Sequence, residues 1–183
     1  RYFDAAKQTI ERFGGVVDKY IGDAVMAIWG ATRAEEDDAE RAVRAGLELI
    51  DMVAKLGADE GATGMAARAG IMTGEASVGP GGNETGLVLG DIVNTASRLQ
   101  SIGDPGEVLV GQTTHDLTNR SIQYTEVGER SLKGKEDSVK VFRAERILAE
   151  RGGVGRADVI EAPFVGRDEE LRLLKDQLHG TTR

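Results

Sequence analysis

The chain has 183 residues, 40% of them hydrophobic and 30% charged, which is typical of one globular domain with a short extension. It has no cysteine and only two histidines, which argues against disulfides, thiol catalysis, zinc–thiolate sites and histidine metal clusters. The formal net charge of −8 disfavours broad nucleic-acid binding, so we expect no nucleic-acid partner. No run of about 18 apolar residues and no signal-peptide pattern occurs, so we expect a cytoplasmic protein without membrane contact in this chain. The chain opens in a helical pattern at Arg1, which predicts natural sequence upstream.

The first predicted elements are a helix and a hairpin. Over residues 1–13 the apolar positions have helical spacing, and Gly14-Gly15 follows as a helix end; the stripe is Phe3, Ala6, Ile10 and Phe13. Two short β-like runs follow at 16–20 and 24–29, on either side of Ile21-Gly22-Asp23. Because Gly-Asp favours a tight turn, we predict a hairpin with Asp23 at its tip.

The longest helix is predicted over 34–56. Acidic residues at 35–38 crowd its start, where the helix dipole favours negative charge. Its expected buried stripe is Ala39, Val43, Leu47, Ile50 and Ala54. After a loop at 57–64, the pattern of residues 66–78 predicts one strand.

The second part of the chain predicts short alternating elements. Strands are expected at 87–89, 108–110, 123–127 and 139–144, and helices at 91–102 and 113–119. In the helix at 91–102 the side chains expected to face inward are Val93, Ala96 and Leu99. Together the elements predict an α+β fold with a mostly antiparallel sheet and helices largely on one face.

Three segments carry side chains suited to phosphate chemistry. Asp23 at an exposed hairpin tip could ligate a hard cation such as Mg²⁺, although Gly-Asp is also a common turn dipeptide. Asn94 and Arg98 share one helix face at i, i+4 and suit a phosphorylated ligand, although they equally fit a solvated face. Lys133, between Leu132 and Gly134, could hold terminal phosphates or simply lie in a solvated turn.

Five blocks in order are more specific than any single segment. They are Lys19-Tyr20-Ile21-Gly22-Asp23-Ala24-Val25-Met26-Ala27, Glu36-Asp37-Asp38-Ala39-Glu40-Arg41-Ala42, Gly70-Ile71-Met72-Thr73-Gly74-Glu75, Gly90-Asp91-Ile92-Val93-Asn94-Thr95-Ala96-Ser97-Arg98-Leu99 and Leu132-Lys133-Gly134-Lys135. With these blocks, residues 1–146 closely resemble the bacterial class III adenylyl and guanylyl cyclase catalytic domains. The resemblance implies a ferredoxin-like cyclase fold and a homodimer with two shared sites for ATP. It also implies two Mg²⁺ or Mn²⁺ ions per site and the formation of cyclic AMP and pyrophosphate.

The resemblance also implies residue roles. Asp23 matches the second of two metal-binding aspartates, and the first belongs to a strand before the opening helix that is not in this chain. Lys19 matches the base-recognising lysine of adenylyl cyclases, where guanylyl cyclases carry Glu. Asn94 matches the ribose-orienting residue and Arg98 the residue that stabilises the transition state. Lys133 matches the lysine that binds the triphosphate.

One substrate-binding position departs from the family pattern. Leu87, seven residues before Asn94, stands where adenylyl cyclases usually have Asp, Thr or Ser, and leucine cannot accept a hydrogen bond from the adenine amino group. Looser base selectivity is therefore expected. An alternative function is a catalytically degenerate cyclase-like domain that serves a larger ATPase regulator as a dimerisation or nucleotide-sensing module. An RNA-binding ferredoxin-like sheet is disfavoured by the charge of −8 and by an aromatic content of 4%.

The C-terminal part predicts two further segments. Residues 147–161 are rich in Gly, Arg and Glu without periodicity, which predicts a linker. Residues 164–171 resemble the entry to P-loop ATPase modules of large bacterial signalling regulators. We therefore expect 162–183 to begin such a domain.

Overall fold

The computed structural model describes residues 1–148 apart from 32, 63, 80–87 and 133–137. It covers most of the cyclase-like region, whereas the expected ATPase segment and all but the start of the expected linker lie outside it. In the described ranges the chain forms four helices and eight strands, and none of these helices is long and apolar enough to cross a membrane.

The N-terminal part is a helix followed by a two-stranded hairpin. α1 (Tyr2–Arg12) leads through a turn into β1 (Val16–Ile21), which pairs antiparallel with β2 (Ala24–Ile28). Ile21 pairs with Ala24, so Gly22 and Asp23 alone form the loop. Gly22 has φ +62°, which glycine adopts without steric cost and which the first loop position of a type II′ hairpin requires. The predicted hairpin, with Asp23 at its tip, is confirmed.

A four-stranded sheet forms the larger part of the core. Its strands lie in the order β3 (Ala69–Ile71), β6 (Val108–Gly111), β8 (Val139–Ile147) and β7 (Ile122–Arg130). β3 pairs parallel with β6, whereas β8 pairs antiparallel with both β6 and β7. A separate antiparallel ribbon joins β4 (Ser77–Val78) to β5 (Val88–Leu89). The predicted α+β fold with a mostly antiparallel sheet is confirmed.

Helices cover both faces of this sheet. On one face α2 (Asp38–Asp59) buries Val43 against residues of β6, β7 and β8, and α4 (Gln112–Thr118) stacks His115 on Phe142 with ring centroids 3.9 Å apart. On the other face α3 (Asp91–Ile102) buries Leu99 against Leu109 and Val141. Alternate residues of a strand face opposite sides, so β6 and β8 supply both clusters. The expectation of helices largely on one face was therefore wrong for α3.

Two predicted elements differ in extent. The run 66–78 is not one strand, because β3 ends at Ile71 in the four-stranded sheet and β4 begins at Ser77 in the separate ribbon. α2 begins at Asp38 rather than at residue 34, because the Asp38 carboxylate accepts a hydrogen bond from the Glu35 amide at 2.7 Å and closes a turn before the helix. Ala54, expected in the buried stripe of α2, is exposed, whereas Val53 and Gly57 are buried.

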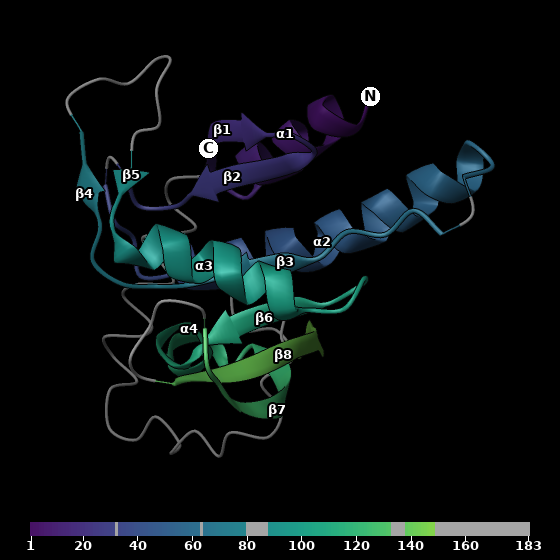
Figure 1. Cartoon of the computed structure of the whole chain (residues 1–183). Helices are drawn as coiled ribbons and strands as arrows, with labels where there is room; N and C mark the ends of the chain where they lie inside the picture. The colour runs from purple at the N-terminus through teal and green to yellow at the C-terminus, as the bar shows by residue number, and fades with distance from the viewer. Residues whose placement is uncertain (32, 63, 80–87, 133–137, 149–183) are drawn as a thin grey trace, which may run out of the picture.

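The hairpin is connected to the sheet through helices. Figure 1 shows α1 and the hairpin above α2, with β6, β7 and β8 below it. α1 contacts α2, with an ion pair from Arg12 to Glu48, and Arg1, just before α1, pairs with Glu60, just after α2. α2 in turn packs on the sheet. Among the described strands, none pairs with the second edge of β2 or of β3. The position of the hairpin therefore depends on side-chain packing rather than on a continuous sheet.

Candidate active site

The base of the hairpin is fixed where α1 turns into β1. Trp29, directly after β2, donates its indole N–H to the carbonyl oxygen of Phe13 at 2.9 Å. A methyl group at Gly15 would lie 2.5 Å from the Trp29 ring, so the ring packs directly on the backbone of the turn. The two ends of the hairpin are thereby held together.

Arg41, in the first turn of α2, supports the same turn from another side. Its side chain is 12% exposed and forms ion pairs at 2.5 to 2.9 Å with three carboxylates, those of Glu35, Asp37 and Asp38. Its guanidinium also lies directly against Gly14, where no side chain intervenes. Sequence reasoning did not single out Arg41, although an arginine one helical turn after an acidic run is a signal for such a cluster.

β1 carries a bulge directly before Lys19. Val17 pairs with Ala27 and Lys19 pairs with Met26, so Asp18 is the extra residue of its strand. The Asp18 side chain is 1% exposed, and its carboxylate lies 3.5 Å from the ammonium of Lys19, whose side chain is 35% exposed. The bulge thus places Lys19 beside a buried carboxylate and leaves part of its side chain accessible to a ligand.

Asp23 is an exposed carboxylate, and within the described residues no hydrogen bond or ion pair engages it. Burial, and secondly the negative charge of Asp23, raises the pKa of the Tyr2 hydroxyl, so the hairpin tip lies near the start of α1. One free carboxylate fits a Mg²⁺ or Mn²⁺ ion, which takes one or two carboxylates together with phosphate oxygens. The described part of the chain contains no group of three potential metal ligands.

α3 presents Asn94 and Arg98 away from the core. Leu99 is fully buried, and Val93 and Ala96 are partly buried, as the helical spacing predicts. Asn94 is exposed and Arg98 half-buried, and in the ranges that the structure describes neither makes a hydrogen bond or an ion pair. The guanidinium of Arg98 is therefore not occupied by a structural ion pair within the described chain.

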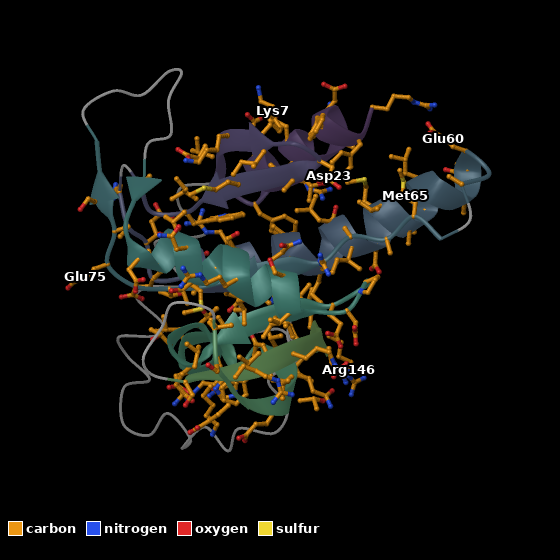
Figure 2. The ribbon with its side chains drawn as sticks, viewed as in Figure 1. Lys7, Asp23, Glu60, Met65, Glu75 and Arg146 are labelled. Atoms are coloured by element: carbon orange, nitrogen blue, oxygen red, sulfur yellow. The ribbon has the colours of Figure 1, made fainter. Side chains whose placement is uncertain are left out.

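The candidate residues do not converge on one place in the described chain. Figure 2 shows Asp23 near the start of α1, whereas Glu75 lies at the other end of the molecule. β4 and β5 lie at the end marked by Glu75, and α3 starts there two residues after β5 (Figure 1). Asn94, in the first turn of α3, is therefore remote from Asp23. Leu87 and Lys133 lie outside the described residues.

Two grooves on the described surface contain none of the predicted site residues. One, of about 480 Å³, lies between α2 and the sheet and is lined by Leu47, Pro105 and Arg143 among others. The other, of about 440 Å³, lies between α1 and α2 beside Met52 and Lys55. Small-molecule sites are usually concave. Because neither groove contains a candidate residue, neither provides a pocket in which these residues could bind a ligand.

Known proteins resemble this chain in sequence and in fold. Residues 5–144 match the profile of the family described as "Adenylate and Guanylate cyclase catalytic domain". An uncharacterised protein of Rhizobium meliloti (strain 1021) is 32% identical over 176 residues, which are 93% of this chain and 17% of that protein. Adenylate cyclase 1 of the same organism is 29% identical over 155 residues, which are 80% of this chain and 23% of that enzyme. This chain thus spans about a fifth of the length of these relatives.

A solved structure supports the same relationship. The crystal structure of the adenylyl cyclase CyaB from P. aeruginosa is similar with a TM-score of 0.73 at 28% sequence identity. The similarity covers 84% of this chain and 82% of that one. With the profile match over residues 5–144, the chain belongs to the adenylate and guanylate cyclase catalytic domain family.

Proposed function

We propose that this chain is the larger part of a nucleotidyl cyclase that converts ATP to 3′,5′-cyclic AMP and pyrophosphate at a homodimer interface, in signal transduction. The observation that carries the proposal is the separation of Asp23 from Asn94, at the start of α3, in a member of the cyclase family. Within the described residues none of Asp23, Asn94 and Arg98 makes a hydrogen bond or an ion pair, so each is available to a nucleotide or its metal ions. A second copy, placed head to tail, would bring Asp23 of one protomer towards Asn94 and Arg98 of the other.

The proposed reaction is an attack of the ribose 3′-oxygen on the α-phosphorus. The new oxygen–phosphorus bond closes the cyclic phosphate, the bond to pyrophosphate breaks, and the hydroxyl proton passes to water. Arg98 donates to the α-phosphoryl oxygens, on which negative charge grows in the transition state, and Asn94 orients the ribose. Lys133, outside the described residues, is proposed to bind the terminal phosphates.

Asp23 is proposed to hold the divalent cations, Mg²⁺ or Mn²⁺, together with phosphate oxygens. The chemistry that such ions supply when bound is activation of the 3′-hydroxyl and neutralisation of charge on the leaving pyrophosphate. We propose that a second aspartate stands in a strand upstream of Arg1. The unpaired edges of β2 and β3 support such a strand, because an added strand needs an edge with free backbone groups.

Lys19 supports ATP as the preferred substrate. Its ammonium can donate to N1 of adenine, whereas N1 of guanine is itself a donor and would oppose it. The bulge at Asp18 favours this role, because it sets the direction of the adjacent Lys19 side chain. Leu87 provides no side-chain acceptor for the adenine amino group, so we propose a modest preference for ATP over GTP, about 1–3 kcal/mol.

An exposed apolar cluster near the hairpin tip supports the proposed homodimer. Phe3, Tyr20 and Ile21 are 38%, 46% and 59% exposed, and the rings of Phe3 and Tyr20 meet edge to face at 4.9 Å. Apolar clusters that remain exposed on one copy often mark an interaction surface. We propose that a second copy covers this cluster and completes the site.

A second candidate function is a degenerate cyclase-like domain that binds a nucleotide or dimerises without turnover. Leu87 favours this candidate. It is opposed by Asp23 and Arg98, because neither side chain makes a hydrogen bond or ion pair within the described residues. For the C-terminal part we propose a linker at 147–161 and the start of a P-loop ATPase module at 162–183. The similarity to the uncharacterised R. meliloti protein covers 93% of this chain and so continues beyond residue 146. Because ATP is the proposed substrate, we also propose that the domain acts in the cytoplasm.

The direct test is a product assay with the full-length protein. It is incubated with Mn²⁺ and either ATP or GTP, and the cyclic nucleotide is identified by mass spectrometry. We expect cyclic AMP from ATP, with a kcat/KM about tenfold or more above that for GTP. ATP binding without any cyclic product would favour the degenerate domain instead.

Mixing two inactive variants tests the shared site. Asp23→Ala and Arg98→Ala are made separately in the full-length protein and then allowed to exchange subunits. One site of each heterodimer carries both substitutions and the other carries neither, so activity should return in up to about half of the heterodimer's sites. If the subunits exchange freely and no cyclase activity returns, the site is not built from two protomers.

A further inference from the structure

α3 lies directly on β3 at Gly70, with no side chain between them. A methyl group at Gly70 would lie closer than 3.0 Å to backbone atoms of α3, namely the carbonyl oxygen of Ala96 and the amide nitrogen and Cα of Gln100. Real Cβ atoms essentially never come so close, and backbone atoms cannot rotate aside as the end of a side chain can. The missing side chain of Gly70 therefore permits this helix–strand separation.

Backbone conformation does not explain the glycine at this position. Gly70 is absent from the described glycines with positive φ, so its φ does not require glycine. Gly74, near the start of α3, would meet only Cδ1 of Ile92 closely, at 2.6 Å, and that atom is the movable end of a side chain. The contact at Gly70 is thus the tighter constraint on how closely α3 approaches the sheet.

Asn94 and Arg98 lie on the side of α3 that faces away from β3. At 3.6 residues per turn, each is about 160° around the helix axis from Ala96, whose carbonyl meets Gly70. Leu99, on the buried side, is fixed against Leu109 and Val141. Any outward shift of α3 would therefore carry both candidate side chains outward with it.

We propose that Gly70 is a positioning residue, which sets the depth of α3 on the sheet and thereby the place of Asn94 and Arg98 at the substrate. The inference rests on the proposed cyclase function. Gly70 touches no substrate and acts only through the backbone of α3. A misplacement of about 1 Å can lower a rate about a hundredfold when a group must meet the reacting atoms. Because Arg98 acts on charge that grows in the transition state, the loss falls on kcat rather than on KM.

Gly70→Ala in the full-length protein tests this role. We expect kcat to fall about ten- to a hundredfold, while KM for ATP stays within about threefold of the wild-type value. The matched control is Gly46→Ala on α2, which covers the opposite face of the sheet. Its methyl group would lie 3.1 Å from Cδ1 of Ile71 and 3.3 Å from Cγ1 of Val108, and its three nearest atoms all belong to side chains of β3 and β6. This control should lower the melting temperature and leave kcat near that of the wild type.

Two kinetic outcomes would overturn the inference. One is a folded Gly70→Ala protein with wild-type kcat, and the other is an equal loss of kcat in Gly46→Ala. A crystal structure of Gly70→Ala gives a readout besides activity, because α3 should be displaced from β6 and β8 by about 1 Å. An undisplaced α3 would refute the positioning role even if no cyclic nucleotide were ever formed. Absence of product from the wild type would instead refute the proposed function.

A second pair of variants serves if Gly70→Ala does not fold. Gly74→Ala should reduce kcat by less than about tenfold relative to the wild type, because the clashing Cδ1 of Ile92 can partly move away. Ile92→Val removes Cδ1 and leaves Cγ1 at 3.9 Å, an ordinary contact, so the double variant should regain wild-type kcat. An unchanged kcat in Gly74→Ala, or a loss that Ile92→Val does not restore, would contradict the inference.

Discussion

The hairpin and the four-stranded sheet are stabilised in different ways, although each carries part of the proposed site. All four residues of β6 are buried, whereas every residue of β1 and β2 remains partly exposed as a whole, although the side chain of Asp18 is buried. In the sheet, apolar packing on both faces fixes α3 and hence Asn94 and Arg98. In the hairpin, polar and aromatic contacts at one turn fix the strands that carry Lys19 and Asp23. Substitutions in the sheet region and in the hairpin should therefore have different effects on activity and on stability.

On the sheet side, Arg98→Ala should give the largest effect of all. We expect kcat to fall about 10²- to 10³-fold, because a donor to the transition state is removed. The free energy of unfolding should change by less than about 0.5 kcal/mol, because no side chain of the described chain pairs with Arg98. Steady-state kinetics and urea unfolding measure both, with Arg120→Ala, an exposed arginine just after α4, as the control. An unfolded Arg98→Ala protein would assign the residue to structure instead.

On the hairpin side, Asp23→Asn should change the metal dependence. The amide keeps the shape of the tip but loses the charge, so the apparent affinity for Mn²⁺ should fall at least about tenfold. Activity is measured against Mn²⁺ concentration at saturating ATP. Asp4→Asn, in α1 with a side chain that is 83% exposed, is the matched control. Equal Mn²⁺ curves for the two variants would remove Asp23 from the metal site.

Substitutions at the base of the hairpin should lower the free energy of unfolding. Arg41→Ala removes a side chain that is 12% exposed and leaves three carboxylates close together, so we expect a loss of about 2–3 kcal/mol. Arg12→Ala breaks the ion pair with Glu48, in which Arg12 is 61% exposed, and should cost less than about 1 kcal/mol. Urea unfolding compares the two. Equal losses would show that the Arg41 cluster does not stabilise the hairpin base.

The smallest effect is expected when the pH is lowered and Glu107, directly before β6, becomes protonated. A hydrogen bond from Arg143 holds the pKa of Glu107 below its ordinary 4.5, and the Asp104 amide adds to this. A carboxyl with a lowered folded pKa stabilises the fold above its unfolded pKa, and this contribution is lost as pH falls through the folded value. Stability should therefore decline below pH 4.5, and Glu107→Gln should flatten that decline. Unfolding midpoints at about pH 6 and pH 3.5 test it, and parallel pH profiles would exclude Glu107 as a cause.

Features with a local signal were predictable from the sequence. The turn residues Gly22 and Asp23 give the hairpin and its tip, because so few residue pairs suit a two-residue loop. The helix predicted at 91–102 is observed with the same bounds, and the common face of Asn94 and Arg98 follows from its period. Their roles at a substrate remain predictions.

Features that depend on distant partners were not predictable. The apolar pattern of 66–78 looks continuous, but the chain leaves one sheet at Ile71 and joins another at Ser77. The side of the sheet that α3 occupies depends on which residues of β6 and β8 face it. The bulge at Asp18 depends on register against β2, and the close approach at Gly70 on where α3 lies. Apart from β2, these partners are far away in sequence, so no local pattern carries the information, and even for β2 the residue pattern does not reveal the exact register.

The hydrogen bond of Trp29 has an optical consequence. Trp29 is the single tryptophan of the chain, so its indole fluorescence reports on one place, the carbonyl of Phe13 at the foot of the hairpin. Water that reaches this indole would shift its emission to longer wavelength, while loss of order in the sheet alone would leave the signal unchanged. The domain thus contains an intrinsic fluorescent reporter, which shows whether the base of the hairpin that carries Lys19 and Asp23 is packed as in the folded structure.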